Sequence, residues 1–166
     1  MTGYDLLYIS RRGWDDLADR REVLTSATTG HRVFVVEDTP VDAAEVPHFK
    51  LRKIGGIVIA TPALPADLSA TNQAAVRRAL IDQLLALYDV DRFVLWLDSP
   101  AEVAQTHQLT PLALIYECTD PPPTTDDPVP IDVSETLIRA ADVLVLSEPR
   151  WSVVEQRVET ALQLRA

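Results

Sequence analysis

The stretch YDLLYISRRGWDDLADRREVL (residues 4–24) joins an apolar run to a polar segment rich in arginine. The run YDLLYIS (4–10) has the length and composition of a β-strand. Asp15 or Asp16 can cap a following helix, and Gly30 can end it. A strand that leads directly into a helix is the repeating unit of α/β folds, so this stretch sets the expected architecture.

The same alternation continues to the end of the chain. Further strands are expected at 31–40, 91–100, 112–120 and 141–147, with two short strands around Gly55-Gly56 within 49–62. Helices are expected at 72–88, 101–107, 132–140 and 151–164. The intervening PPPTTDDPVP (121–130) predicts a loop, because proline interrupts both helices and central strands.

Several of these strands are continuously apolar, which is typical of strands buried on both faces of a parallel sheet. We therefore predict an α/β fold: one three-layer Rossmann-like domain over residues 1–166. Its sheet is expected to be mainly parallel, with about six to seven strands and a small antiparallel edge hairpin.

Composition limits the classes of function. The chain carries 25 acidic and 15 basic residues, which argues against a nucleic-acid partner because phosphate contacts need a basic face. No apolar run reaches the roughly 18 residues of a membrane span, and the N-terminus does not resemble a signal peptide. The single Cys118 fits a reducing compartment, and the residue usage resembles that of GC-rich bacteria. We expect a cytoplasmic bacterial protein.

Motifs for common cofactors are missing from the sequence. There is no GxGxxG or GxxxxGK[ST] glycine loop, and no GxSxG nucleophile elbow. The three histidines are scattered without metal-ligand spacing. We accordingly expect no metal, no cofactor and no catalytic residue.

The arginines after the first strand form the first candidate site. Ligands of parallel sheets bind beyond the carboxyl ends of the strands, where helix N-termini favour anions and arginine suits phosphate or carboxylate. Arg11, Arg12 and Arg20 are candidates for such contacts. The alternative is a solvated helix face, on which Arg20 and Arg21 pair with nearby acids such as Asp16, Glu22 or Glu45.

Acidic residues at later strand ends form the second candidate site. Asp98, Glu117 and Asp120 could meet at the same edge of the sheet and act as acid–base groups. The alternative is that Asp98 and Asp120 cap the segments that follow them. Cys118 fits a small core residue better than a reactive thiol, and the proline-rich loop fits a lid and a linker equally well.

The opening stretch resembles the segment after the first strand of bacterial GT-B glycosyltransferases of the family-4-like, teichuronic-acid type. Their pattern is close to S-x-x-x-W-D-x-x-x-Q-R-P-Q-x-L, which Ser10, Trp14, Asp15, Arg20 and Leu24 match. The chain departs from it at Asp19, Arg21 and Glu22, where the pattern has Gln, Pro and Gln.

Later segments continue the resemblance in order along nearly the whole chain. HRVFVVEDTP resembles the family's second strand, GGIVIATPALP a G-V-x-V-x-x-P-x-L-P segment and FVLWLDSP an x-L-W-x-x-x-P segment. LIYECTD is similar to V-Y-D-x-x-D, with Glu117 in place of the first Asp and Asp120 retained. AADVLVLSEPRW resembles A-D-L-V-F-x-x-S.

The resemblance implies the N-terminal, acceptor-binding domain of a GT-B glycosyltransferase in cell-surface glycan synthesis. Such a domain is not catalytic alone, and it shares a nucleotide sugar with a C-terminal or partner domain. The residues it implies for substrate binding are Ser10, Arg11, Arg12, Trp14, Arg20, Asp98 and Asp120. In these roles Trp14 would stack on a sugar ring, an arginine would contact phosphate and Asp120 would bind a hydroxyl.

The sequence also raises the question of self-association and two alternative classes of protein. The cleft face of an isolated half would be exposed, which favours self-association into a homodimer. The departures from the pattern favour an alternative, a stand-alone, non-catalytic Rossmann-like binding or scaffold protein descended from such a domain. A small flavodoxin-like protein is disfavoured by the lack of a phosphate-binding loop.

Overall fold

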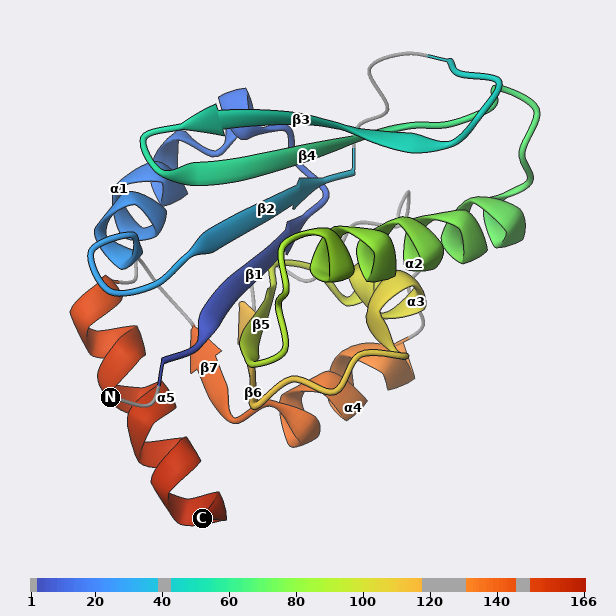
Figure 1. Cartoon of the computed structure of the whole chain (residues 1–166). Helices are drawn as coiled ribbons and strands as arrows, with labels where there is room; N and C mark the ends of the chain where they lie inside the picture. The colour runs from blue at the N-terminus through green and yellow to red at the C-terminus, as the bar shows by residue number, and fades with distance from the viewer. Residues whose placement is uncertain (1–2, 39–42, 118–130, 146–149) are drawn as a thin grey trace.

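Seven strands form one sheet in the computed structural model, which describes residues 3–38, 43–117, 131–145 and 150–166, with only the backbone of 131–135 (Figure 1). The strand order is β3-β4-β2-β1-β5-β6-β7, and every pair is parallel except β3 with β4. The predicted mainly parallel sheet with an antiparallel edge pair is confirmed.

The elements follow the predicted alternation. The strands are β1 (Asp5–Ser10), β2 (Val33–Glu37), β3 (His48–Ile54), β4 (Ile57–Ala63), β5 (Phe93–Leu97), β6 (Ala113–Glu117) and β7 (Val143–Val145). The α-helices are α1 (Ala18–Ala27), α2 (Ala70–Leu87), α3 (Val103–Thr106), α4 (Ile131–Ala140) and α5 (Trp151–Arg165). Two 3-10 turns, η1 (Trp14–Asp16) and η2 (Pro100–Glu102), follow β1 and β5.

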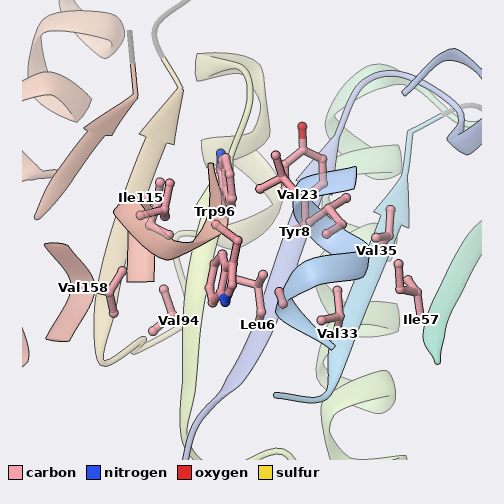
Figure 2. Packing of buried hydrophobic residues seen from close by; sticks show 14 of the residues in the cluster. Leu6, Tyr8, Val23, Val33, Val35, Ile57, Val94, Trp96, Ile115 and Val158 are labelled. Carbon is pink, nitrogen blue, oxygen red and sulfur yellow. The ribbon is translucent and has the colours of Figure 1, made fainter. Parts of the chain in front are cut away.

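Two hydrophobic clusters cover the two faces of the sheet, because successive side chains of a strand point in opposite directions. On one face, Leu6 and Tyr8 of β1 pack with Trp96 of β5 and with Val23 and Val158 from helices α1 and α5, as Figure 2 shows. The other cluster joins the alternate residues of the same strands to α2 and α4; its members include Leu7, Ile9, Ile81, Leu84 and Leu137. The result is the predicted three-layer arrangement.

The closing helix α5 is fixed to the start of β1 through His31. The imidazole ring stacks on Tyr4 with 4.1 Å between the ring centroids and meets Trp151 edge-on. Its Nδ1 lies 2.9 Å from the Tyr4 carbonyl oxygen, and its Nε2 lies 2.8 Å from Glu155 Oε1. These contacts join α5 to residues more than a hundred positions earlier, so the last helix belongs to the same packed unit as β1.

The limits of the first helix differ from the prediction. Neither Asp15 nor Asp16 caps α1, since both lie in the 3-10 turn η1 and the N-cap residue, Leu17, makes no side-chain cap. The helix ends at Ala27 rather than at a left-handed glycine, because Gly30 has no positive φ. At the start of α2, by contrast, the Ser69 hydroxyl accepts a hydrogen bond from the Asn72 amide.

The edge strand β3 is the most exposed strand of the described sheet. All but one of its residues are exposed, including Leu51, Ile54 and the two lysines Lys50 and Lys53, whereas its partner β4 is fully buried. Charged side chains on an edge strand discourage pairing with other chains. Within the described residues, no helix combines the length and apolarity needed to cross a membrane.

The hairpin between β3 and β4 requires glycine at its turn. Gly55 and Gly56 have φ values of +56° and +87°, as in the type I′ turn that connects hairpin strands. An L-residue in this region costs about 1–2 kcal/mol because its Cβ approaches the following carbonyl oxygen.

We predict that Gly56→Ala lowers the free energy of unfolding by about 1 kcal/mol, measured by urea denaturation. The matched control is Gly30→Ala, where φ is not positive and an added Cβ meets nothing within 4 Å. Equal effects of the two substitutions would contradict the assignment of strain to the turn.

Candidate functional site

The candidate site lies at the carboxyl ends of β1 and β5, where the chain reverses its direction across the sheet. From β1 the chain builds β2 and β4 on one side, and it then returns to build β5, β6 and β7 on the other. Such a topological switch point leaves a crevice between the two outgoing loops, which is where α/β sheets bind ligands.

Asp98 connects the two strands at this point. Its carboxylate accepts hydrogen bonds from the Ser10 hydroxyl at 2.6 Å and the Tyr8 hydroxyl at 3.3 Å, and from the Arg11 amide at 3.4 Å. Burial raises the pKa of Asp98, and its side chain is only 6% exposed. The structure therefore brings together the predicted Ser10, Arg11 and Asp98. Asp98 does not cap the next segment, since Ser99 is the N-cap residue of η2.

Arg12 is a predicted cation that stays partly exposed at this edge. Its backbone amide donates to the Ser10 hydroxyl at 3.0 Å, and its Nη1 donates to Asp19 at 3.1 Å. Its Nε lies 3.8 Å from Asp98, and the side chain is 39% exposed. Arg11, next to it, is exposed. This edge therefore offers guanidinium donors, a carboxylate and a hydroxyl to a ligand that carries hydroxyl or anionic groups.

Arg20 has a different environment from the one predicted. Its Nε lies 3.0 and 3.1 Å from the two carboxylate oxygens of Glu117, and its Nη2 contacts the same carboxylate. Both residues are buried. The partner of Arg20 is therefore Glu117. It is neither a phosphate nor one of the predicted acids Asp16, Glu22 or Glu45. Arg20 connects α1 to β6.

Trp14 is buried in the hydrophobic core. The residue is 5% exposed and belongs to the core cluster beside α1, while the guanidinium of Arg21 lies 5.5 Å from the centre of its ring. The predicted stacking on a sugar is therefore not supported by this geometry. Arg21 also donates to the carbonyls of Trp14 and Asp15, so it fixes the η1 turn rather than pairing with Glu22 or Glu45.

Three predicted features cannot be placed. Asp120, Cys118 and the proline-rich loop 121–130 lie outside the described residues. Of the predicted carboxylates, Asp98 and Glu117 do lie at the same edge and close enough to interact electrostatically. Glu117 is paired with Arg20, however, whereas Asp98 accepts hydrogen bonds from Ser10, Tyr8 and the Arg11 amide.

Sequence reasoning missed Glu37, the last residue of β2. This buried carboxylate accepts from the Trp14 amide at 2.8 Å, from Arg52 at 2.9 Å and from the Thr61 hydroxyl at 2.7 Å. It holds the η1 turn against β3 and β4 and so positions the arginines before it. The available signal was an apolar run that ends in a glutamate (VFVVE), the same pattern that drew attention to Asp98.

Sequence reasoning also missed Glu102 in the turn after β5. The residue is fully buried, and burial together with the nearby carboxylates of Asp38 and Asp98 raises its pKa to about 8. One carboxylate oxygen contacts Gln105 Nε2, and the other has no hydrogen-bond partner among the described residues. The raised pKa favours the protonated form of this carboxyl group near neutral pH. In the part of the chain that the structure describes, no group of acids, histidines or cysteines could hold a metal ion.

Comparisons with known proteins extend the description of the fold. No protein-family model and no curated protein matches the chain. The chain is similar to the structure of trehalose-6-phosphate from E. coli bound with UDP-2-fluoro glucose, with a TM-score of 0.54 and 16% identity over 84% of this chain. At this level of identity the likeness concerns the fold.

Two further solved structures are similar at a lower level. They are an alpha,alpha-trehalose-phosphate synthase (UDP-forming) from Burkholderia xenovorans in complex with glucose-6-phosphate (TM-score 0.49, 15% identity, 84% of this chain and 39% of that one) and an alpha,alpha-trehalose 6-phosphate synthase from Burkholderia multivorans (0.48, 13%, 99% and 44%). With TM-scores below 0.5, these two do not establish a shared fold.

The chain spans 39% of the E. coli structure and so corresponds to part of it. The structural similarity is to one domain of a GT-B glycosyltransferase, as the sequence resemblance implied, whereas the teichuronic-acid type is not confirmed.

The Arg20–Glu117 pair allows a test of its structural role. Arg20→Met leaves the Glu117 carboxylate buried without a partner, which should lower the free energy of unfolding by about 3–5 kcal/mol. Arg21→Met, at a side chain that is 41% exposed, is the control and should cost about 1 kcal/mol or less. The double variant Arg20→Met/Glu117→Leu should recover part of the loss. A double variant as unstable as Arg20→Met would show that the cost is not an unpaired charge.

The proton on Glu102 predicts a pH dependence. Between pH 4.5 and about 8 the unfolded chain loses this proton while the folded chain keeps it, so the stability of the wild type falls as the pH rises. Glu102→Gln removes this contribution to the pH dependence of stability, because glutamine does not titrate. The difference in unfolding free energy between variant and wild type should shift in favour of the variant by at most about 1.4 kcal/mol per pH unit in this window. Parallel stability curves would contradict the raised pKa.

Proposed function

We propose that this chain is the acceptor-binding half of a GT-B glycosyltransferase that acts in cell-surface glycan synthesis. In this role it holds a sugar acceptor, and the nucleotide-sugar donor is bound mainly by a second, C-terminal or partner, domain. The chain alone does not transfer sugar.

One observation carries the proposal: the convergence of Ser10, Arg11, Arg12 and Asp98 at the switch point of the sheet. The Asp98 carboxylate can accept a hydrogen bond from a sugar hydroxyl, and Arg12 retains exposed guanidinium surface for a hydroxyl or an acidic substituent. A fold similar to part of a GT-B enzyme supports the same role, because the loops at this edge face outward from the sheet.

A second candidate function is a stand-alone binding or scaffold protein with this fold. It is favoured by the structural use of Arg20 and Trp14, two residues that the family pattern assigns to the ligand side. When the side chains expected at a ligand are paired within the core, the remaining edge has fewer contacts to offer. The two candidates differ in whether the edge binds carbohydrate.

Thermal unfolding of the chain with a panel of neutral, phosphorylated and acidic monosaccharides, and with UDP-glucose, tests the proposal. At a hundredfold excess over Kd, an acceptor-type sugar should stabilise the fold by about 2.7 kcal/mol. UDP-glucose should give little shift. Arg12→Ala should remove the stabilisation, and Arg92→Ala, at the opposite edge of the sheet, should leave it intact.

Two outcomes would overturn this assignment. A strong shift with UDP-glucose alone would contradict an acceptor-side role. No shift with any sugar would favour the stand-alone binding or scaffold protein.

A further inference from the structure

A separate hollow, the η1–β3 pocket, lies between the η1 turn and the edge strand β3. Its volume is about 420 Å³, within the size range of small-molecule sites. None of the residues Ser10, Arg11, Arg12 and Asp98 lines it. The lining includes Trp14, Asp15 and Asp16 on the η1 side, Lys50 and Arg52 on the β3 side, and Glu37 and Thr61 between them.

The buried carboxylate of Glu37 joins the two sides of this pocket. Its Oε1 accepts hydrogen bonds from the Trp14 amide at 2.8 Å and from Arg52 Nη2 at 2.9 Å, and its Oε2 accepts from the Thr61 hydroxyl at 2.7 Å. Glu37 is only 3% exposed. The η1 turn and the Arg52 guanidinium are therefore fixed on the same oxygen atom before any ligand binds, which lowers the cost of ordering the site.

Arg52 is the cation that this arrangement holds ready for a ligand. Its Nη2 is anchored by Glu37, yet the side chain is 45% exposed. Among the described residues, Nε and Nη1 of Arg52 have no hydrogen-bond partner. Lys50 lies two residues earlier, on the same face of β3, and adds a second positive charge. Guanidinium N–H groups in such a setting suit a carboxylate.

The acids on the η1 side restrict the ligand further. Asp15 lies 3.6 Å from Arg21 Nη2, whereas the exposed Asp16 carboxylate has no hydrogen bond or ion pair with the described residues. A purely anionic ligand would meet the charge of Asp16, and a purely cationic one would meet those of Arg52 and Lys50. A zwitterion places each of its charges beside the opposite one.

The rest of the lining is suited to an apolar group. Trp14 is 5% exposed and contributes the margin of its indole, and Thr61 carries a methyl group. The side chains of Lys50 and Arg52 add methylene groups, because long cationic side chains keep only their heads fully in water. The pocket thus combines charged groups of both signs with an apolar floor.

We propose that the η1–β3 pocket binds an α-amino acid with an apolar side chain in its zwitterionic form. The carboxylate contacts Arg52 with the support of the Lys50 charge, the ammonium group contacts Asp16, and the side chain lies against Trp14. This site goes beyond the proposed acceptor-binding function and does not depend on it, because the pocket shares no residue with the edge formed by Ser10, Arg12 and Asp98.

The test is an NMR titration of the isotopically labelled chain with L-phenylalanine and its two singly charged analogues, 3-phenylpropionate and 2-phenylethylamine. L-Phenylalanine should shift the signals of the Trp14 indole N–H and the Thr61 methyl group. Each analogue lacks one of the two charged contacts, so each should bind about tenfold or more weakly than L-phenylalanine.

Three variants assign the contacts. Asp16→Asn removes a carboxylate that the described fold does not use, so it should weaken L-phenylalanine binding about tenfold and leave 3-phenylpropionate binding undiminished. Arg52→Gln should weaken the binding of both. The control is Asp91→Asn, at an exposed acid before β5 on the opposite edge of the sheet, and it should bind as the wild type does. If Arg52→Gln lowers the melting temperature, Asp16→Asn still decides the outcome.

The outcomes separate this site from the proposed function. Binding of either analogue as tightly as L-phenylalanine would overturn the zwitterion assignment. Shifts confined to residues near Ser10, Arg12 and Asp98, or no shift at all, would overturn the pocket assignment. A sugar that shifts the signals of that edge, in a chain that does not bind L-phenylalanine, would leave the acceptor-binding function standing without this site.

Discussion

Strand β1 is enclosed on both faces and both edges, and this constraint determines where the rest of the chain can go. All six of its residues are buried, and it pairs with β2 on one side and β5 on the other. Polar groups at the end of this buried strand therefore need hydrogen-bond partners within the protein. The Ser10 hydroxyl and the Arg11 amide find Asp98, which fixes the relative position of the two loops that leave the centre of the sheet.

The fold was more predictable than the site because strands and turns are signalled by residues that are adjacent in the sequence. Continuous apolar runs identified the strands, and the pair Gly55-Gly56 identified the hairpin through its backbone requirement alone. The partner of Arg20 was not predictable in this way, since Glu117 lies 97 positions away and nearer acids offered competing pairs. The same limit hid Glu37, whose three donors come from three different segments of the chain.

Acids lie near the carboxyl ends of the strands, and the fold stabilises them in different ways. Glu37 and Glu117 are satisfied by arginines and other donors, Asp98 by hydroxyls and an amide, and Glu102 by holding a proton. The paired acids are structural and leave little for a ligand. Of the residues predicted after β1, Arg12 is the one that stays partly exposed beside Asp98, so the candidate site is narrower than the arginine-rich sequence suggests.

The exposed edge strand β3 has a practical consequence. Lys50 and Lys53 are the only lysines in the sequence, and both are exposed on this strand. Apart from the α-amino group, every primary amine of the protein therefore lies at one margin of the sheet, far in strand order from β6 and β7. Amine-directed fluorophores, cross-linkers or immobilisation surfaces will attach there, so the protein can be oriented and tracked by ordinary lysine chemistry without engineered cysteines.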